Sequence, residues 1–226
     1  MAVVATRRTS LIIDPSNGRL PPFTSEGQQR ADARREIGRQ EQRGRPRADG
    51  PEDRDVGDRC MLGFNAGPPM LPGGYNQNLQ IFQTPGHVVV FNEMIHNARI
   101  IPLDGNSHHS LRQWSGDSRS HWHGDTLVIE TINFSGQTSL NGSSPSMRLV
   151  ERFTRVDDGI LTYEMTGDNP DTWTRPWTAE IPLVALEDEV PRLYEYACHE
   201  GNYSMATILS GARLEEAAAQ AVQEQR

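Results

Sequence analysis

The stretch RLVERFTRVDDGILTYEMT, residues 148–166, decides the fold class of this chain. Apolar and polar side chains alternate on both sides of the Asp-Asp-Gly segment at 157–159, and this two-residue period is that of a β-strand. A short Asp/Gly segment between two alternating runs is a strong signal for a tight turn. The stretch therefore predicts an antiparallel β-hairpin.

Similar β-rich runs recur on both sides of this hairpin, separated by Gly, Pro, Asn and Asp. The expected strands are 79–83, 87–92, 98–103, 126–131, 148–156, 160–166, 178–184 and 193–198. No long amphipathic helix lies between them, which argues against an alternating βαβ fold. The pattern predicts an all-β fold: an antiparallel, lipocalin-like barrel of about eight strands, with an N-terminal helical arm and a short C-terminal helix.

The chain divides by composition into three parts, 1–58, 59–211 and 212–226. The first is an expected arm and linker: Thr24 can cap a helix without a broad apolar stripe, and a polar Gly/Pro-rich segment follows. The second is the expected barrel domain, and the third is the Ala/Glu-rich C-terminal helix. An arm of this kind can wrap a second subunit, so a homodimer through the arm is one expectation.

Charge and composition exclude several classes of function. The net charge of −8 argues against a general nucleic-acid binder, which needs a basic face. All 22 basic residues are Arg, so no lysine Schiff base, pyridoxal anchor or phosphate-loop lysine is available, and no cofactor is expected. No apolar run is long enough to predict a membrane span, and residues 1–15 do not form a signal peptide.

The first candidate for catalysis is FNEMIHNARIIPLDG, residues 91–105. We predict that His96 acts as the general acid or base, Arg99 as its electrostatic partner and Glu93 as the group that orients the imidazole. On an extended strand these side chains fall on opposite faces, so they converge only if the chain turns near Asn97. The alternative is a structural histidine bonded to a backbone carbonyl.

Candidate substrate-binding residues come from the loops and from the inward faces of the strands. A strand face that mixes polar and apolar side chains fits a polar-lined cavity, and it fits equally a sheet whose charges face water. Aromatic residues in loops can stack on rings or pack onto the barrel. The candidates are Asn92, Tyr75, Asp104, Asp117, Ser118, Arg119, Trp122, Glu151, Tyr163, Trp177, Tyr194 and His199.

Metal and nucleophile motifs are weak. His121 and His123 have a usable ligand spacing, but no third ligand is fixed, so no metal site is predicted. Ser118 lies in Gly-Asp-Ser-Arg, which is not a nucleophile-elbow motif. Cys60 and Cys198 are either a disulfide, which needs an oxidising compartment, or two buried thiols.

Several long motifs resemble those of a family, and the resemblance covers about residues 15–213. They are NEMIHNARIIPLDG, QWSGDSRSHWHGDTLVIETINF, LVERFTRV, TWTRPWT and YEYACHEGNY. They are similar to those of a large family of uncharacterised, mostly exported bacterial proteins that is abundant in Acidobacteria and some Proteobacteria. The family pattern falls on His96, Arg99, Asp104, Gly105, Gly116, Ser118, Trp122 and residues 124–128, and it departs at His123, where the family usually has an acidic residue.

The resemblance implies no general activity. It implies a mature form of an exported protein, periplasmic or secreted, and it favours the disulfide. Two functions are expected. The first is a cofactor-independent acid/base enzyme (lyase, hydratase, isomerase or hydrolase) acting on a polar ring such as a sugar or a phenolic compound. The alternative is a non-catalytic, lipocalin-type protein that binds a small molecule.

Overall fold

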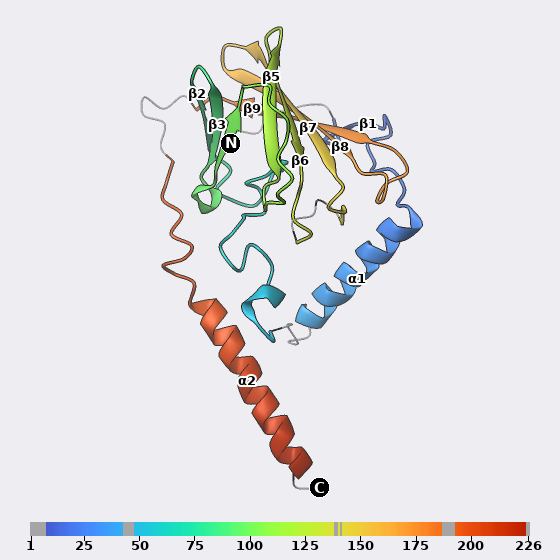
Figure 1. The fold of residues 1–226 in the computed structure, drawn as a ribbon, viewed down its shortest axis with the longest axis vertical. Helices are drawn as coiled ribbons and strands as arrows, with labels where there is room; N and C mark the ends of the chain where they lie inside the picture. Colours follow the sequence, from blue (N-terminus) through green and yellow to red (C-terminus); the bar gives the residue numbers. More distant parts are fainter. Residues whose placement is uncertain (1–7, 43–47, 138–139, 141, 187–192, 225–226) are drawn as a thin grey trace.

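The computed structural model describes residues 8–42, 48–137, 140, 142–186 and 193–224 (Figure 1). Its strands are β1 (Ile12–Asp14), β2 (Leu79–Gln83), β3 (His87–Asn92), β4 (Ala98–Pro102), β5 (Asp117–His123), β6 (Thr126–Ile132), β7 (Arg148–Asp157), β8 (Ile160–Asp168) and β9 (Trp177–Val184). Two α-helices, α1 (Ser25–Gln42) and α2 (Tyr203–Glu224), and two 3₁₀ turns, Pro51–Asp53 and Met94–His96, complete the elements.

The strands form two antiparallel sheets. The large sheet has the order β1-β9-β8-β7-β6-β5, and the small sheet has the order β2-β3-β4. The mainly antiparallel β fold expected from the sequence is therefore confirmed. No strand pairing within the described part of the chain closes the two sheets into one barrel.

The apolar alternation read from the sequence explains how the sheets pack. In β7, Leu149, Glu151 and Phe153 are buried while the residues between them are partly exposed. The partner strand β8 buries Tyr163 and Met165 in the same manner, and the turn between β7 and β8 falls at the predicted Asp-Asp-Gly segment. The core lies between these side chains and the inward side chains of the small sheet.

The strands β4 and β5 are the outer strands of the two sheets, and they lie next to each other. A side-chain bond connects them: the hydroxyl of Ser120 donates to the carbonyl of Pro102 at 2.9 Å. β4 and β5 do not pair with each other through backbone hydrogen bonds. The N–H and C=O groups along their facing edges therefore lie at the seam between the two sheets without a partner strand.

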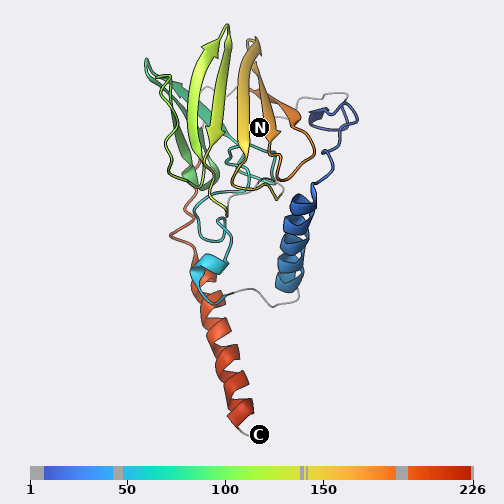
Figure 2. The ribbon, with the colours of Figure 1, turned by 45° about the vertical axis from the view of Figure 1, so that its right-hand side comes forward.

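The N-terminal part packs on the same chain. β1 extends the large sheet beside β9, and Phe23 forms an isolated bridge with Trp173. Thr24 caps α1 as expected, because its hydroxyl accepts a hydrogen bond from the N–H of Gly27 at 3.0 Å. Figure 2 shows α1 beside the end of the large sheet.

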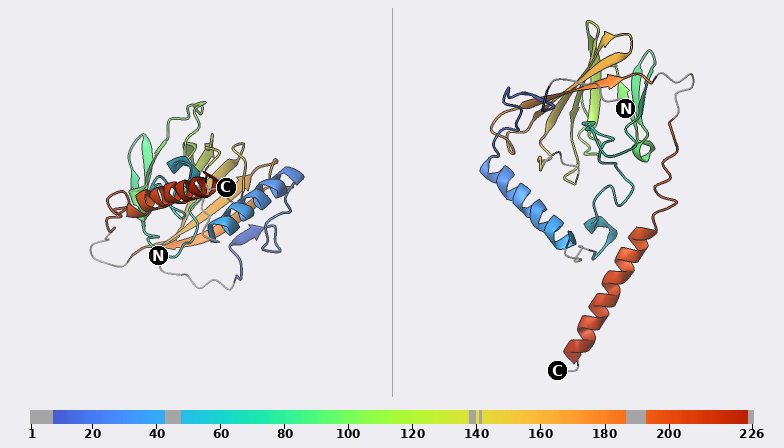
Figure 3. Two further views of the ribbon diagram at one scale, coloured as in Figure 1. Left: turned by 90° about the horizontal axis from the view of Figure 1, so that it is seen from below. Right: turned by 180° about the vertical axis from the view of Figure 1, so that it is seen from behind.

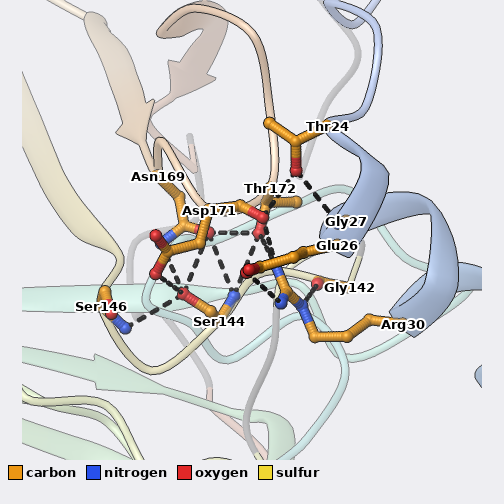
Figure 4. Close-up of polar contacts among 10 residues, drawn as sticks. All are labelled: Thr24, Glu26, Gly27, Arg30, Gly142, Ser144, Ser146, Asn169, Asp171 and Thr172. Carbon is orange, nitrogen blue, oxygen red and sulfur yellow. Dashed lines mark hydrogen bonds and ion pairs between the residues drawn. The ribbon is translucent and has the colours of Figure 1, made fainter.

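A buried polar network holds α1 to the loops of the large sheet (Figure 4). The guanidinium of Arg30 donates to the hydroxyl of Thr172 at 2.8 Å and to the carbonyl of Asp171 at 2.5 Å. Behind it, the N–H and hydroxyl of Ser144 donate to the amide oxygen of Asn169, at 3.1 and 3.2 Å. The described part of the predicted arm is thus bonded to its own domain.

Four elements differ from expectation. β1 was not predicted, because no strand was expected before residue 79. β5 was not predicted, because all its residues except Trp122 are polar and it lacks the apolar alternation of an ordinary strand. Residues 193–198 were predicted as a strand and are irregular instead. The C-terminal helix begins at Tyr203 rather than at residue 212, and α2 projects away from the sheets (Figure 3).

Cys60 and Cys198 form a disulfide across 138 residues of sequence. The bond joins the loop before β2 to the segment that leads into α2, and it is consistent with an oxidising compartment. Within the described ranges, no helix is long and apolar enough to cross a membrane.

Candidate functional site

The three residues predicted to act together do not share a site. β3 ends at Asn92, and a 3₁₀ turn at Met94–His96 leads into β4. Ile95 and His96 adopt left-handed backbone angles, with φ of 54° and 41°, so the expected turn is present. It leaves the side chain of His96 exposed to solvent, whereas Arg99 lies in the core.

Glu93 and His96 each have their own partner. The buried carboxylate of Glu93 accepts hydrogen bonds from the side-chain amides of Asn76 and Asn78, at 2.6 and 2.7 Å. The ring Nδ1 of His96 lies 3.1 Å from the carbonyl of Tyr196. Glu93 therefore does not orient the imidazole of His96, and their catalytic roles stay predictions without a common site.

Arg99 belongs to a buried network between the sheets. Its Nη2 lies 2.8 Å from Oε2 of Glu151. The hydroxyl of Tyr163 donates to Oε1 of the same carboxylate at 2.7 Å and accepts from the N–H of Met70 at 3.0 Å. Burial, with a smaller contribution from the charge of Glu151, raises the pKa of Tyr163 well above its ordinary value, so the phenol remains protonated.

A cavity of about 510 Å³ opens at the seam beside Arg99. We call it the seam cavity. Its lining comes from β4, from the first residues of β5, from the turn before β5 and from Met61. The lining residues are Met61, Asn97, Ala98, Arg99, Ile100, Pro102, Arg112, Gln113, Trp114, Ser115, Gly116, Asp117, Ser118 and Arg119. Four of the predicted site residues, Arg99, Asp117, Ser118 and Arg119, therefore meet here.

Glycine at position 116 fixes the turn that forms this wall. Gly116 has a φ of 69°, which is a conformation that L side chains rarely adopt. A Cβ at this position would lie 2.6 Å from Cγ2 of Thr131 and 2.7 Å from the carbonyl oxygen of Ile132. The close approach allows Asp117 to begin β5 directly after the turn.

The lining of the seam cavity is rich in arginine. Among its described lining residues, Arg99, Arg112 and Arg119 are cationic and Asp117 is the single carboxylate. Arg112 uses Nη1 to donate to two backbone carbonyls, at 3.1 and 2.8 Å, so these bonds do not neutralise its charge. Trp114 adds an aromatic wall with the guanidinium of Arg59 5.6 Å from its ring centre.

Three donor atoms behind the wall of the cavity have no acceptor. Nε and Nη1 of Arg99 and Nδ2 of Asn97 are buried, and no hydrogen-bond partner for them occurs in the described ranges. A buried donor without an acceptor costs about 1–3 kcal/mol. Because these atoms have almost no accessible surface, they add to the cost of the buried network and not to the binding surface of the cavity.

Asp117 connects the cavity to a histidine that the sequence analysis did not select. Its carboxylate lies 3.1 Å from Nη1 of Arg119 and accepts a hydrogen bond from the N–H of His109 at 2.7 Å. Nδ1 of His108 lies 3.2 Å from the same carboxylate, and its Nε2 lies 3.8 Å from Oε1 of Glu130. His108 is thus held between two carboxylates on the outer face of β5 and β6.

Ser118 is not placed as a nucleophile. Its hydroxyl lies 2.8 Å from the hydroxyl of Thr131 and is buried against β6. Within the described residues its hydroxyl is thus bonded to another hydroxyl and not to a general base. Neither His121 nor His123 belongs to a cluster of three metal-ligating side chains in the part of the chain that the structure describes.

The other predicted binding residues lie outside the seam cavity. Tyr75, Trp122, Tyr194 and His199 are exposed. Asp104 is also exposed, and hydrogen bonds from the backbone and side chain of Asn106 lower the pKa of its carboxyl. Asn92 is buried and donates to the carbonyl of Ala66 at 2.9 Å. Trp177 is buried with its ring centre 5.5 Å from that of Trp173.

Four residues at the site were not predicted from the sequence: Asn97, Arg112, Trp114 and His108. One signal was available for three of them: Asn97, Arg112 and Trp114 lie inside or directly beside two of the five motifs that carry the family resemblance. The seam could not be foreseen, because it depends on which strands end up as the sheet edges.

Comparisons with known proteins returned no match: no protein-family model, no curated protein and no solved structure matches the chain. The resemblance to exported bacterial proteins therefore stays a prediction. The function has to be argued from the geometry of the site.

Proposed function

We propose that the protein binds a small anionic molecule in the seam cavity and serves as a ligand-binding protein outside the cytoplasm. The carrying observation is that Arg112 lines a polar cavity of about 510 Å³ and that no carboxylate among the described residues pairs with it, whereas Arg99 pairs with Glu151 and Arg119 with Asp117. That volume lies within the range of small-molecule sites, about 300–1,000 Å³. The ligand class is a compound with a carboxylate, phosphate or sulfate group.

The chemistry of arginine supports this class. The planar guanidinium binds carboxylate and phosphate oxygens through paired N–H donors and keeps its charge at any physiological pH. The edges of β4 and β5, which form no backbone ladder with each other at the seam, supply further hydrogen-bond groups. The sequence predicted a ligand-binding cavity of lipocalin type. We keep that part of the prediction as a proposal and place the opening of the cavity at the seam between the two sheets.

A thermal-shift assay with phosphate, sulfate, citrate and glucose 6-phosphate tests the proposal. At least one of these anions should raise the melting temperature of the wild type, and sodium chloride at equal ionic strength should not. The Arg112→Gln variant should lose this shift, because a cation of the lining is gone. The matched control is Arg152→Gln, which removes a half-exposed arginine paired with Glu164 on the outer face of the large sheet.

Asp117→Asn provides an outcome of opposite sign. It removes the single lining carboxylate and should strengthen anion binding, whereas a general folding defect would weaken binding in both variants. If no anion shifts the melting temperature, or if Arg112→Gln and Arg152→Gln behave alike, the proposal fails.

The second candidate is the acid/base enzyme, and the contact between His108 and Asp117 favours it. A histidine held by a carboxylate is a common arrangement for proton transfer, and Asp117 lies in the cavity wall. We propose that His108 would take the role first assigned to His96. Screening sugars and phenolic compounds for turnover distinguishes the two functions: an enzyme loses several orders of magnitude in rate in His108→Gln while anion affinity persists.

The homodimer through the N-terminal arm stays a proposal about partners. Light scattering on the full chain measures it directly. A monomeric mass at micromolar concentration would remove it.

A further inference from the structure

A second cavity, separate from the seam cavity, has a different lining. It encloses about 610 Å³ between α1, the loop before β2, the β3–β4 turn and Tyr196. We call it the aromatic cavity. Its described lining includes the apolar side chains Leu62, Phe64, Leu71, Met94, Ile95, Phe134, Leu140 and Met147.

Aromatic rings at this cavity remain accessible. Phe64 and Tyr75 are 59% and 55% exposed, and their ring centres lie 5.6 Å apart in an edge-to-face arrangement. Tyr196 lies next to them, and its hydrogen bond with Tyr75 raises its pKa. Accessible rings that hold one another in place form a preorganised surface on which a flat apolar group can stack.

The described lining of this cavity holds one cation, Arg34, and two carboxylates, Asp55 and Asp58. Asp58 pairs with Arg54 at 2.6 Å, and Oδ1 of Asp55 is turned to its own loop, where it accepts hydrogen bonds from the N–H groups of Gly57 and Asp58. Arg34 reaches the cavity from α1, and within the described residues no ion pair or hydrogen bond engages its guanidinium. Partial burial there lowers the pKa of Arg34.

We propose that the aromatic cavity is a second binding site, for an aromatic carboxylate. The ring would stack against Phe64 and Tyr75 and fill the apolar interior, and the carboxylate would pair with Arg34. Each part of the ligand thus has its own contact: the ring has the apolar lining, and the carboxylate has the unpaired guanidinium of Arg34. This site is independent of the anion proposed for the seam cavity.

Isothermal titration with trans-cinnamate and its neutral analogue trans-cinnamamide tests the assignment. The wild type should bind cinnamate at least about tenfold more tightly than the amide, as expected for a charge-assisted pair. Arg34→Gln should bring cinnamate down to the affinity of the amide. Arg35→Gln is the matched control, because Arg35 lies next to it on α1 and pairs with Asp32 on the exposed face.

Phe64→Ala should weaken both probes, since stacking does not depend on charge. The circular dichroism spectrum should be unchanged, because Phe64 is more than half exposed. Arg119→Gln should leave cinnamate affinity as it is, because Arg119 lines the seam cavity and its bonds to Ser107, Ser118 and Asp117 do not involve the lining of the aromatic cavity. Absence of binding by either probe, or equal affinities in the wild type, Phe64→Ala and Arg34→Gln, would overturn the proposal.

Discussion

At the scale of single residues, the buried network of Arg99, Glu151 and Tyr163 shows how a polar group can serve the fold instead of the site. Glu151 has no exposed surface, pairs with one guanidinium nitrogen of Arg99 and accepts a hydrogen bond from the phenol of Tyr163. Taking such charges out of water is costly unless each has its partner. The network therefore fixes how the small sheet sits on the large one.

Removing one charge of this network should be expensive. Arg99→Met leaves Glu151 as an unpaired buried carboxylate, and we expect a loss of about 3–5 kcal/mol in the free energy of unfolding. The double variant Arg99→Met/Glu151→Leu should recover most of that loss, because no charge is left unpaired. Urea denaturation of the two variants measures both values. A double variant less stable than the single one would contradict this account.

The stability of the protein at alkaline pH should depend on Tyr163. Its pKa in the folded state is raised above the ordinary value of 10.0, so its contribution to stability is present below about pH 10 and is lost as the pH rises further. Above pH 10 the unfolded chain releases a proton that the folded chain keeps. The stability of the wild type should therefore fall more steeply than that of Tyr163→Phe, by up to about 1.4 kcal/mol per pH unit. Equal slopes in chemical denaturation at pH 10–11 would refute the assignment.

At the scale of elements, the attachment of α1 depends on one close approach. A Cβ on Gly27 would lie 2.3 Å from the carbonyl oxygen of Thr172, within the polar network of Figure 4. Gly38 is in the same helix and has open space around it. Gly27 therefore has no room for a side chain, whereas Gly38 does.

Substituting each glycine by alanine should give opposite results. Gly38→Ala should stabilise the protein by about 0.5–1 kcal/mol, as expected for a helix interior. Gly27→Ala should destabilise it and expose residues 25–42 to faster hydrogen exchange, because the helix has to move away from the loop. Hydrogen-exchange mass spectrometry with thermal melts measures both effects. If Gly27→Ala matched Gly38→Ala, α1 would not be held as described.

The elements show what sequence patterns can predict. Strands with an apolar face, such as β3 and β7, were located within a few residues, because alternation and the Asp-Asp-Gly turn depend on local sequence. β5 was missed, because Asp117 and Arg119 face a polar cavity rather than a core. The candidate site was predicted in part: Arg99, Asp117, Ser118 and Arg119 meet, whereas Glu93 binds Asn76 and Asn78 and His96 is exposed, because the expected turn does not aim them into one cavity.

At the scale of the whole molecule, the seam cavity lies where the edge strand β4 of the small sheet meets the edge strand β5 of the large sheet. The disulfide joins segments 138 residues apart, and Asn202 adds a bond of 2.7 Å to the carbonyl of Asp58 beside it. The segment that leads into α2 is thereby fixed to the loop before β2. The arginine-rich lining of the seam cavity lies on β4, on β5 and on the turn before β5.

Breaking the disulfide should lower stability without removing the fold of the sheets. Replacing both cysteines by serine should cost about 2–5 kcal/mol, because a long loop in the unfolded chain is no longer closed. Thermal denaturation with and without dithiothreitol measures the effect, with the double serine variant as the control that no longer responds to the reductant. An unchanged melting temperature on reduction would contradict this expectation.

Isothermal titration of the anion with the largest thermal shift, compared between the wild type, Arg112→Gln and Asp117→Asn, tests anion binding in the seam cavity most directly. The wild type should bind one anion per chain. Arg112→Gln should bind at least about tenfold more weakly, and Asp117→Asn should bind more tightly. Equal affinities for all three proteins, or no measurable heat in any of them, would contradict the assignment of this cavity as an anion site.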